Sequence, residues 1–188
     1  MTSGTSCAEK IIGSICIDEG GIMPEKETIE RAREDARQGK SPSTQAGEFV
    51  HEEIEHIREG KHGARSAKQA IAIGLSKARR AGVKLPPPKE GKSSASTRQK
   101  ASKDYEKGQR PAAGTPSPTR SRATRKALQR EGTQAASHEG LSRQAKASAE
   151  NRSASERSSA ARKAVATKGP EELKRAARKA ARTRTAGG

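Results

Sequence analysis

The chain has 188 residues, of which 29% are hydrophobic and 32% are charged, and its formal net charge is +17. Nineteen residues are Ile, Leu, Val or Phe, which is too little apolar surface for one globular domain of this length. No apolar run approaches the roughly 18 residues of a membrane span, so the sequence predicts none.

The charge is unevenly distributed along the chain. Residues 1–22 carry a net charge of −2, residues 23–91 carry +3, and residues 92–188 carry +16. The large apolar residues lie mainly before the basic half. The sequence therefore predicts three parts, an N-terminal extension over 1–22, a small helical domain over 23–88, and a basic low-complexity tail over 89–188.

The N-terminal extension differs in composition from the rest of the chain. It is rich in Ile, weakly acidic, and holds both cysteines, Cys7 and Cys16. Their spacing fits no zinc pattern, and we expect both to be reduced, as in a cytoplasmic protein. No basic segment precedes the short apolar run, as a signal peptide would require. Because Met23 is followed by the helix-start residue Pro24, we expect translation to begin natively at Met23 and residues 1–22 to be a non-native extension.

Three helices are predicted in the small domain, over 24–38, 42–59 and 67–81. Each begins with a helix-start signal, either a proline in the first turn or the capping box that Ser66 forms with Gln69, and each is followed by a glycine. The predicted fold is mostly α. It consists of a small three-helix N-terminal unit followed by a largely disordered basic tail with transient helices.

The helix over 67–81 carries an apolar stripe, with Ile73 on the opposite side. Ile73 either packs against the first helix or remains exposed as a contact for a partner. Because a domain this small is marginally stable, we expect stabilisation by self-association or by a partner that contacts residues 42–82.

The second and third predicted helices carry opposite charges. Residues 42–59 contain five Glu and one Arg, whereas the third helix and its exit are basic. Either these charges complement one another on solvated faces, or the acidic helix docks the basic tail and competes with its ligand.

The second predicted helix also resembles two functional motifs that the sequence does not complete. His51 and His56 flank an acidic stretch, as in a zinc-protease helix, but they are five residues apart and therefore about 140° apart around the helix. We expect solvated histidines paired with neighbouring Glu, and no metal site. The loop before the third helix is longer than the turn of a helix-turn-helix, which argues against sequence-specific DNA reading.

Three stretches of the small domain carry a resemblance to known proteins: Lys40–Val50, Ile57–Ser66 and Lys68–Leu85. The domain resembles an uncharacterised family of small basic bacterial proteins, some of which are labelled DNA-binding. The resemblance covers residues 23–90 and implies a chain start at Met23. It implies no activity and no catalytic residues.

The basic tail contains an internal repeat. Residues 160–168 and 176–184 match at seven of nine positions when Lys and Arg are treated as equal, and residues 123–128 are a weaker copy. Pro170, followed by two Glu, predicts a helix start. As helices, the copies place basic residues on one face with Ala opposite. Such a stripe repels itself, and short helices are marginal in water, so we expect the tail to fold along a polyanion.

The residues that the tail lacks indicate which polyanion it binds. Tyr105 is its only aromatic residue, which argues against stacking on single strands, and Ala is too weak an anchor for a membrane surface. Duplex DNA bound through its phosphates remains, and structured RNA is bound in the same way. The tail is also similar in composition to linker-histone tails. The sequence predicts a non-specific nucleic-acid-binding protein of the cytoplasm, nucleoid-associated or protective.

The alternative is a protein-interaction adaptor, whose helical head recruits a partner and whose basic tail anchors it to a polyanion such as RNA. An enzyme is not expected, because the sequence shows no placed nucleophile–base pair and no Gly-rich phosphate loop, and no cofactor is predicted. The residues expected to contact phosphate are Arg122, Arg125, Lys126, Arg130, Arg162, Lys163, Lys174, Arg175, Arg178, Lys179, Arg182, Arg184, Lys77, Arg79 and Arg80.

Overall fold

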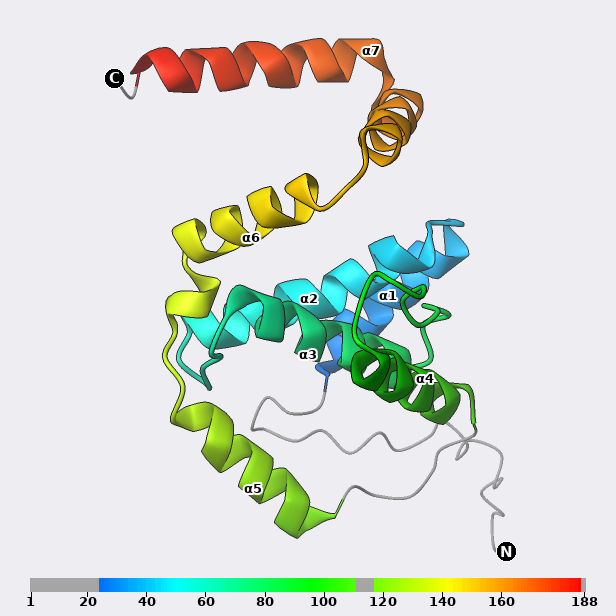
Figure 1. Ribbon diagram of the computed structural model, residues 1–188, viewed down its shortest axis with the longest axis vertical. Coiled ribbons are helices and arrows are strands. Elements are labelled where there is room, and N and C mark those ends of the chain that lie inside the picture. The colour runs from blue at the N-terminus through cyan, green and yellow to red at the C-terminus, as the bar shows by residue number, and fades with distance from the viewer. Residues whose placement is uncertain (1–23, 111–116, 187–188) are drawn as a thin grey trace, which may run out of the picture. The chain divides into compact units, whose positions relative to one another are not determined.

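The structure, a computed structural model, describes residues 24–110 and 117–186, and these residues form helices and connecting segments without a strand (Figure 1). The mostly α class is confirmed. The predicted extension over 1–22 and the predicted start at Met23 lie outside the described residues. The elements are α1 (Lys26–Arg37), α2 (Pro42–Arg58), α3 (Ala67–Arg80), α4 (Ala95–Gln109), α5 (Pro118–Gln129), η1 (Gln134–Ala136), α6 (His138–Glu150) and α7 (Ala154–Ala186).

The first three helices follow the bounds that the sequence predicts to within two residues. Pro42 occupies the first turn of α2, and the Ser66 hydroxyl accepts a hydrogen bond of 3.2 Å from the Gln69 amide at the start of α3. Local signals therefore determine where these helices begin and end. Glycines with positive φ follow all three helices: Gly39 at 69°, Gly60 at 74° and Gly82 at 94°.

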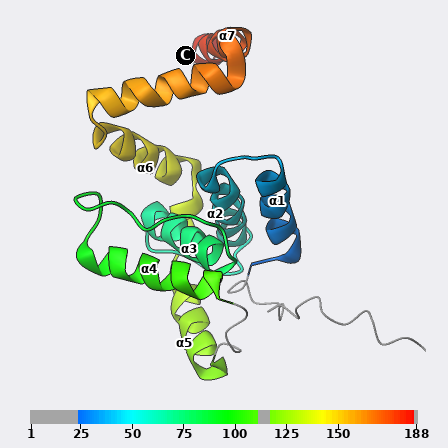
Figure 2. The ribbon, with the colours of Figure 1, turned by 90° about the vertical axis from the view of Figure 1, so that its right-hand side faces the viewer.

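Helix α2 lies between α1 and α3 and packs against both (Figure 2). One apolar cluster joins α1, α2 and α3 around Phe49, and a second joins α2, α3 and η1 around Ile57. The backbones of α2 and α3 come so close at Gly74 that a Cβ atom there would lie 2.7 Å from the Val50 Cα. The core is therefore small but closely packed.

Helix α4 adds a fourth element to this packing, because it lies against α3 (Figure 2). The Asp104 carboxylate accepts hydrogen bonds from the Ser76 hydroxyl (2.6 Å) and from the Arg80 guanidinium (2.7 Å). At Gly108 the backbone of α4 leaves no room for a Cβ atom beside the Arg79 carbonyl oxygen. Hydrophobic periodicity does not reveal such a contact, because charged and small residues make it.

Residues 128–136 pack against the α2–α3 loop. The Gly63 amide donates a hydrogen bond of 3.0 Å to the Leu128 carbonyl, and the Ala64 amide donates one of 3.1 Å to the Gly132 carbonyl. Both alanines of η1 are buried against α2 and α3. A segment far along the chain thus holds this loop in place.

Ile73 is half-buried on α3, whose main neighbours are α2 and α4 rather than α1. Ile73 is therefore not an exposed contact for a partner, which was one of the two possibilities that the sequence left open. Among the described residues, the exposed large apolar side chain is Val165 in α7. The surface over residues 42–82, which the sequence predicts for self-association, therefore has no exposed large apolar side chain among the described residues.

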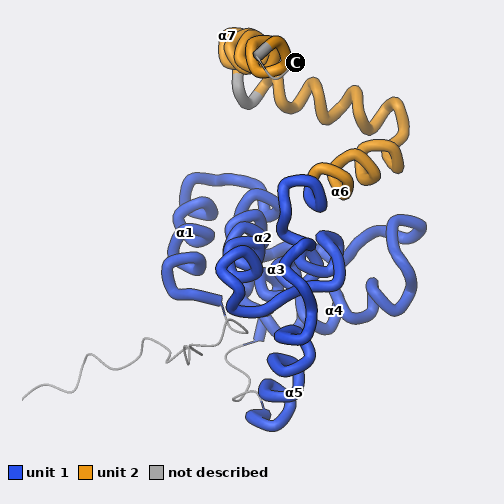
Figure 3. The backbone as a smooth tube through the Cα atoms, turned by 90° about the vertical axis from the view of Figure 1, so that its left-hand side faces the viewer, with its two compact units in different colours: residues 1–141 blue, residues 142–188 orange. Residues whose placement is uncertain are grey.

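The chain divides into two compact units, residues 1–141 and residues 142–188 (Figure 3). The first unit holds α1 to α5 and η1, and the second holds most of α6 and all of α7. The first unit thus extends well past residue 88, where the sequence predicts the small domain to end, because α4 and η1 pack against α2 and α3.

The basic tail is helical in the structure, so the expectation that it is largely disordered is not supported. Its helices are rich in Ala, Arg, Lys, Glu and Gln, which are good helix formers. Helix α7 is interrupted at Gly169 (φ 74°, ψ 160°), directly before Pro170, and consists of two helical segments. None of the described side chains in the second unit is buried, so no core supports these helices. Within the described residues, every helix is either too short or too polar to span a bilayer.

Candidate nucleic-acid interface

The second unit is strongly basic, with 13 Lys or Arg against four Glu in residues 142–188 and a net charge of +9. In the C-terminal segment of α7 these cations form one exposed face, because their spacing is i, i+3, i+4 and i+7. At 1.5 Å per residue the face is about 10 Å long. It consists of Arg175, Arg178, Lys179 and Arg182.

Two cations of this segment pair with carboxylates one turn earlier. Lys174 Nζ lies 2.9 Å from Glu171 Oε1, and Arg175 Nη2 lies 3.0 Å from Glu172 Oε1. All four side chains are more than half exposed, and such pairs contribute only about 0.2–0.5 kcal/mol each. They support the helix without a ligand and are weak enough to be exchanged for phosphate contacts.

The other predicted cations of α7 are exposed as well. Arg162 and Lys163 lie on the surface of its N-terminal segment. Arg184, in the last turn, donates a hydrogen bond of 3.3 Å from Nε to the Ala180 carbonyl, a favourable place for a cation because carbonyl groups point toward that end of a helix. Both strong copies of the repeat are therefore helices with exposed cations.

In α5 the predicted stripe is divided between two faces. Arg122, Lys126 and Arg130 are exposed at intervals of four residues, whereas Arg125 is half-buried on the side that carries Leu128. Three of the four predicted residues are therefore accessible to a ligand on the first unit.

The basic residues at the end of α3 have structural contacts instead. Lys77 is buried, and its Nζ lies 2.7 Å from Glu53 Oε2. Arg79 is also buried, and its guanidinium donates hydrogen bonds to the carbonyls of Leu85 (3.2 Å) and Pro86 (3.4 Å). Burial lowers the pKa of Arg79. The prediction that Lys77 and Arg79 contact phosphate is therefore wrong, since protein atoms surround them.

Arg80 is exposed, but its Nε lies 2.7 Å from Asp104 Oδ1 and joins α3 to α4. On α2, Glu48 Oε2 lies 2.8 Å from Arg31 Nε of α1. Between α2 and α3 themselves, the opposite charges meet where Lys77 pairs with Glu53, which favours mutual complementarity over docking of the basic tail. The complementarity includes buried groups and is not confined to solvated faces.

The expectation of solvated histidines is wrong for His56. His51 is exposed, but His56 is only 3% exposed. His62, in the α2–α3 loop, is 4% exposed and lies beside Glu53, with 3.4 Å between Nε2 and Oε1. A histidine in a glycine-containing loop gives no local signal of burial, so sequence reasoning missed it.

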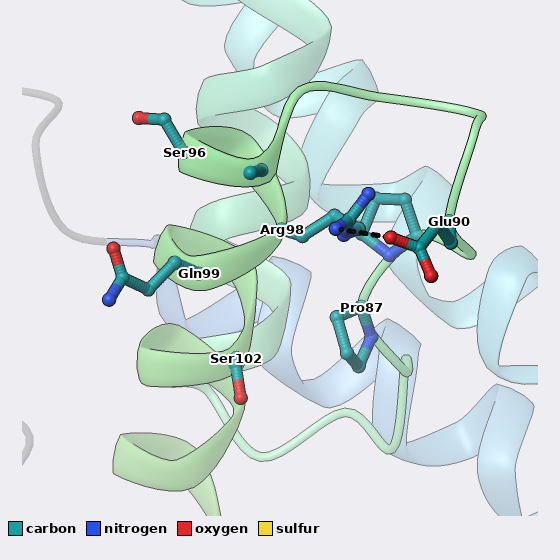
Figure 4. Close-up of a pocket in the computed structure, with 8 residues that line it drawn as sticks. Pro87, Glu90, Ser96, Arg98, Gln99 and Ser102 are labelled. Atoms are coloured by element: carbon teal, nitrogen blue, oxygen red, sulfur yellow. Dashed lines mark hydrogen bonds and ion pairs between the residues drawn. The ribbon is translucent and has the colours of Figure 1, made fainter.

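An open hollow lies between the proline segment before α4 and the first turns of that helix (Figure 4). Pro87 and Gln99 line it, and its two charged side chains, Glu90 and Arg98, pair with each other at 3.1 Å. The remaining lining is small or polar. The charged groups of the hollow therefore neutralise each other.

With this geometry established, comparison with known proteins adds one finding. Residues 37–90 match the model of a family of unknown function, DUF6496. The match agrees with the resemblance to an uncharacterised family and brings no activity with it. The DUF6496 stretch contains α2, α3 and the loop between them, and it ends before the exposed cations of α5 and α7. No match was found among curated proteins or among solved structures.

Proposed function

We propose that this protein binds nucleic acid without reading its sequence, with duplex DNA as the principal ligand, through phosphate contacts from exposed Lys and Arg of α7 and α5. The observation that carries the proposal is the cationic face of α7, which has no buried side chain behind it. A helix with neither a core nor an apolar face is stabilised by a polyanion, because phosphates neutralise its repulsive charge and counterions are released.

The shape and composition of α7 favour a duplex over a single strand. An α-helix is about 10–12 Å in diameter, and the major groove of B-DNA is about 12 Å wide, so α7 can lie along the groove with cations directed to the phosphates. Single-strand binders use exposed aromatic rings as stacking platforms. Phe49 is buried and Tyr105 is half-buried, and these are the chain's two aromatic residues.

The proposed role is nucleoid-associated, compacting or protecting DNA in the cytoplasm. Structured RNA presents the same phosphate chemistry and is therefore the second ligand to test. The adaptor alternative keeps the same basic anchor but assigns the function to a protein partner of the first unit.

The test compares the affinities of the full chain for duplex DNA, single-stranded DNA and structured RNA over a range of salt concentrations, by fluorescence anisotropy. If six to ten phosphates are contacted, affinity for the duplex falls about 10³–10⁵-fold between roughly 50 and 200 mM salt. Replacing Arg175, Arg178, Lys179 and Arg182 together by Gln, which keeps helix propensity, is expected to reduce the slope of log affinity against log salt by about 3–4.

A matched control removes the same charge elsewhere. Lys26, Arg33, Lys68 and Lys84 are exposed on the first unit, and replacing these four by Gln is expected to change the slope by less than about 1, because they lie outside the proposed interface. Equal losses in both variants would show that overall charge, not the α7 face, binds DNA. No binding to any of the three nucleic acids at low salt would reject the proposal.

A further inference from the structure

The end of α2 contains a buried cluster that nucleic-acid binding does not use. Glu53 and His56 lie one turn apart on α2, and His62 lies in the loop that follows. Their exposed fractions are 0%, 3% and 4%, and one potential ligand atom of each lies within 4.8 Å of the others. We propose that Glu53, His56 and His62 bind a divalent transition-metal ion of the zinc class, as a structural site.

Hydrogen bonds orient both histidines for this role. His56 Nε2 lies 2.8 Å from Glu25 Oε1, and an ionised carboxylate can only accept a hydrogen bond, so His56 Nε2 donates it. His62 Nδ1 lies 3.2 Å from the Gly63 carbonyl oxygen, which can only accept. Each of these nitrogens therefore carries a proton, and the lone pair of the opposite ring nitrogen is left for a metal. Histidine ligands in metal sites are fixed in this way.

The atoms that face the cluster lack hydrogen-bond partners. Glu53 Oε1, His56 Nδ1 and His62 Nε2 are all buried without one, which is costly for polar atoms. The 3.4 Å between Glu53 Oε1 and His62 Nε2 is close to the roughly 3.3 Å that separates two tetrahedral ligands with bonds of about 2.0–2.1 Å. Wider separations, up to 4.8 Å, shorten by side-chain rotation when an ion draws the ligands together.

The charges around the cluster also favour a cation. Glu25, Glu52 and Glu53 contribute three carboxylates, and Lys77 is the buried ammonium among them, with its Nζ 2.7 Å from Glu53 Oε2 and 3.5 Å from Glu52 Oε1. Lys61 Nζ also lies 3.3 Å from Glu25 Oε1, so the two ammonium groups leave one negative charge, which attracts a divalent ion. Glu53 can then offer one oxygen to the ion and the other to Lys77. Glu52 Oε1, 3.9 Å from His56 Nδ1, adds negative charge beside the cluster.

A protonated His62 paired with Glu53 is the alternative that needs no metal. It would provide partners for Glu53 Oε1 and His62 Nε2, but it would leave His56 Nδ1 buried without one. A metal ion satisfies all three inward-facing atoms at once, so the observations favour the metal.

The position of His62 indicates what the ion would do. Gly63 and Ala64, which follow it, donate the hydrogen bonds that hold residues 128–136 to the loop. An ion shared by α2 and this loop would therefore tie together two parts of the first unit. Its binding free energy would add to the folding free energy of a domain with a small core.

The test measures Zn²⁺ binding to the full chain carrying Cys7→Ser and Cys16→Ser, so that thiolates cannot bind the metal. The protein is prepared without a histidine tag, stripped with a chelator and dialysed against Zn²⁺. One Zn²⁺ per chain is expected, together with a rise in Tm of about 10 °C when free Zn²⁺ exceeds Kd about 100-fold. Failure to retain stoichiometric Zn²⁺ overturns the proposal.

A matched pair of histidine variants locates the site. His62→Gln is expected to weaken Zn²⁺ binding at least about 100-fold, whereas His51→Gln, on the exposed side of α2, is expected to leave it unchanged. Co²⁺ bound to the chain that keeps all its histidines should show the intense visible bands of a tetrahedral site. This measurement keeps the test decisive even if His62→Gln does not fold. Equal Zn²⁺ binding by the two histidine variants would overturn the assignment.

Discussion

Lys77 and Arg178 are both basic residues on helices, and at the scale of single residues their burial separates their roles. Lys77 lies inside the first unit against Glu53, whereas Arg178 lies on an exposed helix with no buried residue behind it. A buried cation neutralises buried carboxylates, and its removal leaves them unpaired in a medium of low polarity. An exposed cation remains accessible to phosphate.

Replacing Lys77 tests this reasoning. Lys77→Met is expected to reduce the free energy of unfolding of the first unit by about 3–5 kcal/mol, because Glu52 and Glu53 lose their buried cation. Urea unfolding followed by circular dichroism measures the change. Lys68→Met, on the exposed surface of the same helix, should change it by less than about 0.5 kcal/mol. Equally small effects for both variants would contradict a buried ion pair.

At the scale of elements, small residues decide how closely the helices approach. At Gly74, an added Cβ would lie 2.7 Å from the Val50 Cα and 2.9 Å from the Phe49 carbonyl oxygen. At Gly47, also within a helix, an added Cβ would meet nothing within 4 Å. The two glycines look alike in sequence, but only Gly74 is required by packing.

The two glycines therefore give opposite expectations. Gly74→Ala is expected to destabilise the first unit by about 1–3 kcal/mol, because α2 and α3 must move apart. Gly47→Ala is expected to stabilise it by up to about 1 kcal/mol through helix propensity. Thermal and urea unfolding of both variants provide the comparison. Stabilisation by Gly74→Ala would show that the helices do not approach as closely as described.

At the scale of the whole molecule, the two units differ in what stabilises them. The first has apolar clusters around Phe49 and Ile57, whereas no described side chain of the second is buried. Helices without tertiary packing open more readily, because backbone hydrogen bonds alone oppose the gain in conformational entropy. A ligand that binds α7 should therefore affect the second unit most.

Hydrogen exchange of the full chain, with and without duplex DNA at low salt, measures this difference. Without DNA, amides of α2 and α3 are expected to exchange slowly and those of α7 rapidly. Addition of DNA should slow exchange in α7 and leave α2 unchanged. If the amides of α7 are as protected as those of α2 before DNA is added, the second unit has stabilising contacts that the proposed function does not include.

Local sequence patterns predict the helical class, the bounds of the first three helices, and the cationic spacing on the last helix. Pro42 and the Ser66 cap act on neighbouring backbone groups, and the face formed by Arg175, Arg178 and Lys179 follows from helical periodicity. All of these depend on residues within two turns of one another, so they are visible in a linear pattern.

Which charges are buried and which distant segments meet depends on how the helices pack in three dimensions. Arg80 pairs with Asp104, and His62 lies beside Glu53 and His56, although no local spacing predicts either contact. Burial of a polar side chain depends on what packs over it from elsewhere in the chain. For that reason both the exclusion of Lys77 from the proposed nucleic-acid interface and the proposed metal site could be recognised only in three dimensions.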